Sequence, residues 1–183
     1  MTRAFAITLN ALGLYAVALV LAVAFAAQLL LHELPCPLCL LQRVAFTVLA
    51  VGPIMNIRWG PRPSHYALSL LAAVAGAVFS SRQVLLHIMP GDAGYGTALF
   101  GYHYYTLALL AFIAAIVLLA AMLLFDRQFE EDGAAQVVAP GAFAMSAVWL
   151  VIALTALNVV STLLECGFAA CADNPLVYEL LKR

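Results

Sequence analysis

Hydrophobic residues fill five long runs of this chain, and short polar stretches between the runs hold most of its prolines and charges. Each run has about the 17–25 residues that a helix needs to cross the hydrocarbon of a bilayer. Because lipid offers no water to the backbone, such runs must be helical. We predict membrane-spanning helices near residues 5–31, 39–57, 66–89, 104–125 and 142–165, followed by a tail at 166–183.

Composition agrees with this pattern. Of the 183 residues, 66% are hydrophobic and 9% are charged, which is more apolar surface than a soluble domain of this length can bury. The net charge is −1 and no basic patch exists to collect phosphates, so nucleic acid is excluded as a partner. Residues 24–26 resemble a signal-peptide cleavage site, but the first run is much longer than the usual core of about 7–15 residues. The chain is therefore predicted to be an all-α integral membrane protein in contact with lipid.

Loop charges predict the orientation of the chain. Lys182 and Arg183 lie on the opposite side from the N-terminus, some distance past the last span. The positive-inside rule favours a cytoplasmic N-terminus. The arginines that lie on the N-terminal side are Arg3, Arg58, Arg62 and Arg127.

Four cysteines form two close pairs, Cys36/Cys39 and Cys166/Cys171, and four spans separate the pairs, so both face the same side of the membrane, which the loop charges predict to be the outside. In Pro-Cys-Pro-Leu-Cys-Leu-Leu-Gln-Arg (35–43), a disulfide would be strained and exchangeable, and its short loop would add little stability. If Pro37 opens the next helix, both sulfurs lie near a helix N-terminus, where the dipole favours thiolate. The stretch predicts a redox-active pair.

Three ionisable residues within the runs are candidates for ligand binding. Arg43 follows Cys39 by four residues, which puts both on one helix face. A guanidinium stays protonated, so Arg43 is predicted to stabilise the Cys39 thiolate and donate to an electron acceptor, unless it merely reaches for the membrane surface. Arg82 and His87 lie at a similar depth in the third run and form either part of this pocket or an interfacial polar belt.

Other readings stay open at this point. Cys166 and Cys171 form either a static clip or an exchangeable pair that meets a soluble partner. The four thiolates, with His32 as a further ligand, are also candidates for a soft-metal site, although we predict no metal. The aromatic residues near the fourth run are typical of an interfacial belt, and the wall of a planar ligand's pocket is the alternative. They are Tyr95, Phe100, Tyr102, Tyr104 and Tyr105.

Two stretches, 35–43 and 81–92, resemble the disulfide bond formation protein B (DsbB) family. These membrane oxidases of the bacterial inner membrane regenerate a soluble periplasmic thiol oxidant and pass electrons to quinone. The resemblance covers roughly residues 5–125 and implies a four-helix bundle of DsbB type, extended here by a fifth transmembrane helix. It implies ubiquinone or menaquinone as the cofactor, Cys36/Cys39 as the quinone-coupled pair and Arg43 as its contact, whereas His87 matches only loosely.

The chain departs from the family in its second cysteine pair. In the family this pair usually lies between spans three and four, but residues 89–103 contain no cysteine here, and Cys166/Cys171 follow the fifth span instead. The resemblance therefore implies a thiol oxidase that relays electrons through Cys166/Cys171 and Cys36/Cys39 to quinone. Its partner would be a periplasmic thioredoxin-fold oxidant or a special dithiol substrate. The alternatives are a thiolate metal-binding protein and a quinone reductase resembling the vitamin K epoxide reductase family, whose CxxC usually lies in a late helix.

Overall fold

The computed structural model describes residues 1–130 and 141–182, and within them five helices are long and apolar enough to cross a membrane. Residue 183 of the predicted tail lies outside this part. The predicted all-helical membrane fold is confirmed. The long helices are α1 (Arg3–Leu30), α2 (Pro37–Trp59), α3 (Pro63–Leu86), α4 (Tyr104–Leu123) and α5 (Ala142–Cys166).

Proline and glycine determine where several of these helices begin and end. α2 begins two residues before the predicted boundary, because Pro37 occupies a first-turn position that needs no backbone N–H. Pro63 starts α3 in the same way. α5 ends at Cys166, because Gly167 takes a positive φ of 63° that stops the helix.

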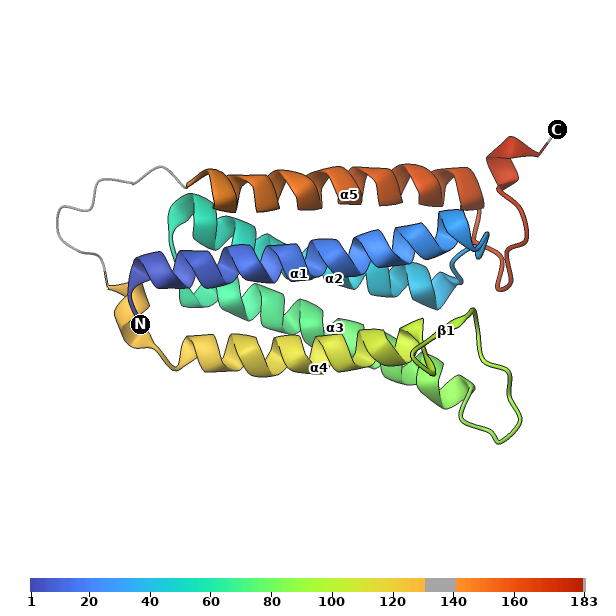
Figure 1. The fold of residues 1–183 in the computed structure, drawn as a ribbon, viewed down its shortest axis with the longest axis horizontal. Coiled ribbons are helices and arrows are strands. Elements are labelled where there is room, and N and C mark those ends of the chain that lie inside the picture. The colour runs from blue at the N-terminus through green and yellow to red at the C-terminus, as the bar shows by residue number, and fades with distance from the viewer. Residues whose placement is uncertain (131–140, 183) are drawn as a thin grey trace.

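The helices form a bundle in which α2 lies centrally. α2 packs against α1 and α3, α4 packs mainly against α3, and α5 lies along α1 and also contacts α2 (Figure 1). At mid-bundle the rings of Phe46 and Phe112 stack with centroids 4.0 Å apart. Gly76 makes room for them, since a Cβ there would lie 2.3 Å from the Phe112 ring. This packing fixes α2, α3 and α4 against one another below the thiols.

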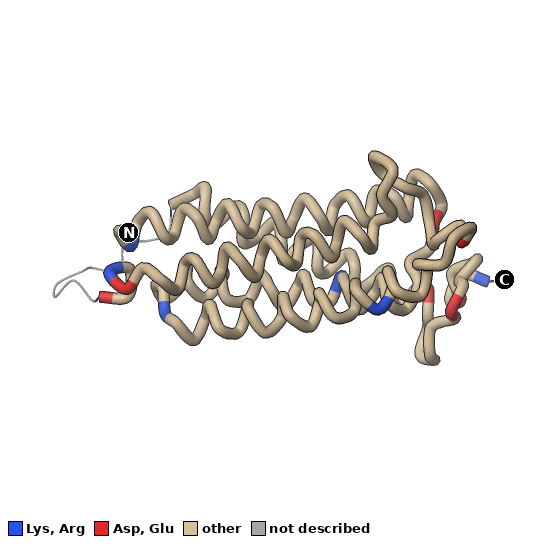
Figure 2. Tube along the Cα trace, turned by 90° about the horizontal axis from the view of Figure 1, so that it is seen from below, with Lys and Arg blue, Asp and Glu red and all other residues tan. Residues whose placement is uncertain are grey.

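One end of the bundle, which we call the thiol end, carries residues 31–36, 87–103 and 167–182 (Figure 1). Residues 98–103 form a hairpin there, in which β1 (Ala98–Leu99) pairs antiparallel with β2 (Tyr102–His103). The tail carries a short 3₁₀ turn, η2 (Glu179–Leu181), and a second one, η1 (Asp126–Phe129), lies at the opposite end. Most of the Lys, Arg, Asp and Glu residues lie toward the two ends of the bundle, and few lie in the helices between them (Figure 2).

Candidate functional site

The first cysteine pair, here the CxxC pair, lies where α2 begins. Cys36 is the N-cap, and its Sγ accepts a hydrogen bond from the backbone N–H of Cys39 at 3.2 Å. Both cysteines are free thiols, with Cys36 buried and Cys39 partly buried. The hydrogen bond from the Cys39 N–H to Cys36 Sγ satisfies one of the N–H groups that a helix start leaves unpaired. Both sulfurs lie in the positive field of the helix end.

Gln83 of α3 bridges the two sulfurs. Its Nε2 lies 3.2 Å from Cys36 Sγ and 3.4 Å from Cys39 Sγ, and its Oε1 accepts from Gln42 Nε2 at 2.8 Å. The Gln83 side chain is only 1% exposed, so these bonds form away from solvent. The amide can therefore donate to a thiolate on either sulfur, which favours the charged form.

The two sulfurs are not equivalent. The pKa of Cys36 is raised, first because its thiol shares a hydrogen bond with Cys39 and second because it is buried. Cys36 is thus the sulfur that keeps its proton when the pair ionises.

Arg43 lies one turn below Cys39 and is held by residues of α1 and α5. Its Nη1 donates to Gln28 Oε1 at 2.7 Å and to Asn158 Oδ1 at 3.1 Å, and its Nη2 donates to the Ala24 carbonyl at 2.9 Å. These acceptors are uncharged, so none of them is a counter-ion to the guanidinium. Its hydrogen bonds join α2 to α1 and α5, and its role as the partner of the Cys39 thiolate stays a prediction.

Arg43 and Cys39 both line a cavity of about 280 Å³ bounded mainly by α1, α2 and α4. Most of its wall is apolar, and Tyr95, Tyr104 and Tyr105 contribute phenol rings. These are three of the aromatic residues for which a pocket wall was the alternative prediction. The other two, Phe100 and Tyr102, are exposed on the hairpin.

The loop between α3 and α4 contributes Tyr95 and Leu99 to the wall of this cavity. The Glu33 carboxylate accepts from Thr97 N at 2.9 Å and from Thr97 Oγ1 at 3.1 Å. Tyr95 donates its hydroxyl to the Leu34 carbonyl at 2.6 Å, and burial raises the pKa of Tyr95, so the phenol stays neutral. The loop is therefore attached to the segment that precedes the CxxC pair.

The terminal pair, Cys166 and Cys171, forms a disulfide at the same end of the bundle (Figure 1). Cys166 is buried and Cys171 is partly exposed. The tail beyond them folds back, so that the Tyr178 hydroxyl accepts from Gln28 Nε2 at 3.0 Å. Gln28 also donates to Ser161 at 2.6 Å, so one amide links Arg43, α5 and the tail.

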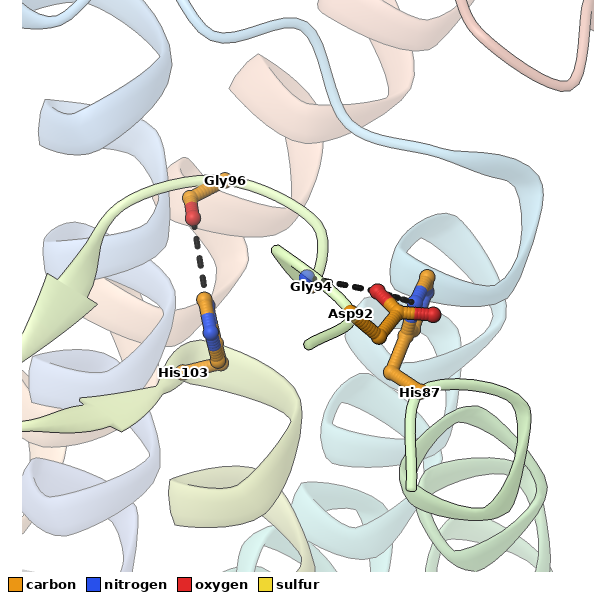
Figure 3. Close-up of polar contacts among 5 residues, drawn as sticks. All are labelled: His87, Asp92, Gly94, Gly96 and His103. Carbon is orange, nitrogen blue, oxygen red and sulfur yellow. Dashed lines mark hydrogen bonds and ion pairs between the residues drawn. The ribbon is translucent and has the colours of Figure 1, made fainter. Parts of the chain in front are cut away.

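The structure does not bring Arg82 and His87 into the cavity with Cys39. Arg82 is exposed and lines a separate shallow hollow between α3 and α4. His87 Nδ1 lies 3.1 Å from Asp92 Oδ1, which also accepts from Gly94 N at 2.8 Å (Figure 3). His103 Nδ1 lies 3.1 Å from the Gly96 carbonyl, so both histidines brace the loop.

Sequence reasoning missed several polar residues that surround the thiols. Gln28, Gln42 and Asn158 are buried in membrane-spanning helices and bond directly to Arg43 or Gln83. Their sequence signal was present, because a polar side chain inside an apolar span usually has a partner there. Glu165, a carboxylate beside Cys166, carried the same signal.

The described residues also bear on the metal alternative. Among residues 1–130 and 141–182, no group of three or more His, Cys, Asp or Glu side chains is placed to hold a metal ion. A four-thiolate centre would require the terminal disulfide to open and both pairs to converge.

Comparison with known proteins identifies relatives of the first half of the chain. The family model for disulfide bond formation protein DsbB matches residues 6–97. A disulfide bond formation protein B of Xanthomonas axonopodis pv. citri is 41% identical over 86 residues, which are 44% of this chain and 50% of that protein. Disulfide bond formation protein B 2 of Burkholderia lata is 38% identical over 91 residues, 49% of this chain and 54% of that protein.

The matched region spans about half the length of these curated relatives, and no solved structure matches the chain. It contains α1, α2 and α3, and with them the CxxC pair, Arg43 and Gln83. α4, α5 and the terminal pair lie beyond it.

Proposed function

Because the chain belongs to the DsbB family of disulfide bond formation proteins, we propose that it is a membrane thiol oxidase that passes electrons from a periplasmic dithiol to quinone. One observation carries this proposal. A free CxxC pair at a helix N-terminus lines a largely apolar cavity with an arginine, at the same end of the bundle as a second cysteine pair.

The lining of the cavity supports a quinone head group as its occupant. Its apolar wall suits a ring, Arg43 supplies a permanent hydrogen-bond donor, and Tyr104 and Tyr105 supply aromatic faces. Bound there, ubiquinone or menaquinone would accept two electrons and two protons from the CxxC pair. Arg82 and His87 lie outside this cavity, so their part in quinone binding stays a prediction.

The two sulfurs of the CxxC pair have different roles in this proposal. Cys39 lines the cavity and faces the acceptor, whereas Cys36 does not line it and keeps its proton longer. Gln83 holds both sulfurs and donates to whichever becomes charged. Arg43 lowers the free energy of negative charge on Cys39 and on an acceptor oxygen at the same place.

The terminal pair would receive electrons from outside. A reduced partner, either a thioredoxin-fold oxidant or a special dithiol substrate, would attack Cys171, because it is the more exposed sulfur. The partner's second thiol then releases the mixed disulfide and leaves Cys166 and Cys171 as thiols. These two thiols reduce the Cys36–Cys39 disulfide and close their own disulfide again.

The proposed orientation follows the charges. The N-terminal end of the bundle carries Arg3, Arg58, Arg62 and Arg127, whereas Lys182 is the one lysine or arginine within residues 31–36, 87–103 and 167–182 of the thiol end. In a multi-pass protein of the inner membrane, the positive-inside rule favours a cytoplasmic N-terminal end, which supports the proposal that the thiol end faces the periplasm.

An interpair disulfide tests the relay. In a Cys39→Ala/Cys171→Ala chain, we expect a Cys36–Cys166 disulfide to accumulate on mild oxidation, visible by mass spectrometry and as a nonreducing gel shift. The matched control is Cys36→Ala/Cys171→Ala, which keeps Cys39, the sulfur that lines the cavity. This control should form much less interpair disulfide. If Cys166→Ala/Cys171→Ala oxidises the natural dithiol partner at the parental rate, the terminal pair is a clip and the relay is refuted.

A further inference from the structure

A buried carboxylate lies beside the terminal disulfide and has no hydrogen-bond partner. Glu165 precedes Cys166 in the last turn of α5 and is only 2% exposed. Neither of its two carboxylate oxygens has a hydrogen-bond partner among the described residues. A buried polar group without a partner costs free energy, so its presence needs a reason other than packing.

The neighbourhood of Glu165 is polar and lies on one face of α5. Asn158, Ser161 and Glu165 follow at helical spacing and are all buried. Asn158 accepts from Arg43, and Ser161 accepts from Gln28. Glu165 thus continues a line of polar groups that leads from Arg43 toward Cys166.

A simple counter-ion role does not account for this carboxylate. A buried arginine and glutamate that served each other would form a close ion pair, since only good geometry offsets the loss of water. Arg43 donates instead to Gln28, Asn158 and the Ala24 carbonyl. The charges of Arg43 and Cys39 still influence Glu165, so the carboxylate lies within electrostatic range of the CxxC pair.

We propose that Glu165 is the proton acceptor for electron transfer between the two cysteine pairs. The inference rests on the proposed relay and assigns it a residue outside the region that the family model matches. As the Cys166 sulfur attacks the Cys36–Cys39 disulfide, the S–S bond breaks, a Cys166–sulfur bond forms, and the Cys166 proton moves to the Glu165 carboxylate. The thiolate that departs from the Cys36–Cys39 disulfide then takes this proton from Glu165. When Cys171 closes the Cys166–Cys171 disulfide, its proton goes to the second departing sulfur, so two electrons and two protons reach the CxxC pair.

The charged groups within electrostatic range of Glu165 come from more than one element. From α2 these are Arg43 and Cys39, and from the α3–α4 loop the charge of Tyr95 is also in range. α1 contributes the uncharged Gln28, and the tail contributes Tyr178, whose charge would act on Arg43. Burial of Glu165 favours its neutral form, and the charge of Arg43 opposes this by favouring the carboxylate, which is the form that accepts a proton.

The test follows electron transfer in the full-length chain with quinone removed and both pairs oxidised. Dithiothreitol is added, and acid quenching, alkylation and mass spectrometry give the redox state of each pair over time. A well-placed proton acceptor contributes about 100-fold or more, so Glu165→Gln should slow reduction of the CxxC pair by that factor. Reduction of the terminal disulfide itself should be unchanged or faster, because the variant removes a negative charge beside it.

The pH profile separates proton transfer from a structural effect. In Glu165→Gln the rate should rise tenfold per pH unit below the thiol pKa, because only free thiolate then reacts, whereas the parental rate should depend less steeply on pH. Glu165→Asp should restore part of the rate. Glu179→Gln makes the same change at an exposed glutamate of the tail and should match the parent.

Two outcomes would overturn the inference in distinguishable ways. If Glu165→Gln transfers electrons at the parental rate and with the parental pH dependence, Glu165 is not the proton acceptor and the relay stands. If dithiothreitol reduces the CxxC pair equally fast in Cys166→Ala/Cys171→Ala, the relay itself is wrong and the role of Glu165 falls with it.

Discussion

Replacing Gln83 by methionine should weaken both the stability of the bundle and the reactivity of the CxxC pair. Methionine keeps the length and volume of the side chain but removes the amide that donates to both sulfurs and accepts from Gln42. Gln42 is only 6% exposed, so its Nε2 would lose its partner away from solvent. An orphaned buried donor costs about 1–3 kcal/mol, and we expect the free energy of unfolding to fall by this amount.

The same change removes donors from the thiolate. A hydrogen bond to a charged group contributes about 1.5–3 kcal/mol, and 1.4 kcal/mol corresponds to about a tenfold change in thiolate fraction. Alkylation of the reduced CxxC pair by iodoacetamide should therefore slow by about tenfold or more. Leu85→Met, on the lipid-exposed face of the same helix, is the matched control and should leave both quantities unchanged.

A double variant checks the reasoning behind the stability loss. In Gln42→Leu/Gln83→Met both partners are apolar, so no buried donor is orphaned and the bundle should be more stable than with Gln83→Met alone. Stability is measured by denaturant titration of the protein in mixed micelles, and reactivity by mass spectrometry of the alkylated chain. A Gln83→Met chain with parental stability and parental alkylation rate would refute the assignment of this amide.

Three further predictions address the acceptor, the membrane and the loop. Arg43→Ala should weaken quinone binding by about 1.5–3 kcal/mol, and an unchanged Michaelis constant for quinone with full turnover would contradict this. After reduction, both cysteine pairs should react with a membrane-impermeant reagent from the periplasm, and labelling only from the cytoplasm would overturn the orientation. The pKa of Asp92 is lowered, first by the hydrogen bond from the Gly94 N–H and then by His87. The Asp92 carboxylate should therefore stabilise the loop fully above the ordinary aspartate pKa of about 3.9, and this stabilisation should be lost as the pH falls through the lowered pKa. Asp92→Asn should remove this stabilisation at every pH, so the Gly94 amide should exchange its hydrogen faster than in the parent.

The helices and their order could be predicted because lipid imposes a strict condition on the chain. An apolar run in hydrocarbon has no alternative to the helix, and Pro37 and Pro63 mark the starts of helices. The position of the CxxC pair at a helix start follows from local sequence alone, which is why Cys36, Cys39 and Arg43 could be selected without a structure.

The rotation of each helix about its axis could not be predicted. In a soluble helix, polar residues mark the exposed face, but lipid and protein interior are both apolar, so this contrast is weak here. Arg82 and Gln83 show the consequence. They are adjacent in the sequence, and Arg82 is exposed on the outside of the bundle while Gln83 is buried against the sulfurs.

Contacts between distant segments also could not be predicted from the sequence pattern. The bond from Gln28 to Tyr178 joins residues 150 positions apart, and the attachment of Thr97 to Glu33 joins two loops. Neither has a local signal, since each depends on how the spans are placed around α2.

The cavity beside Cys39 reaches the side of the bundle, because Leu19 and Val23 line it and are exposed on the membrane-spanning part of α1. α4, on its other side, packs mainly against α3. A hydrophobic molecule can therefore exchange sideways with the surrounding bilayer without crossing water. The concentration that governs occupancy is then the mole fraction in the lipid, and apparent affinities measured in detergent will vary with the amount of detergent present.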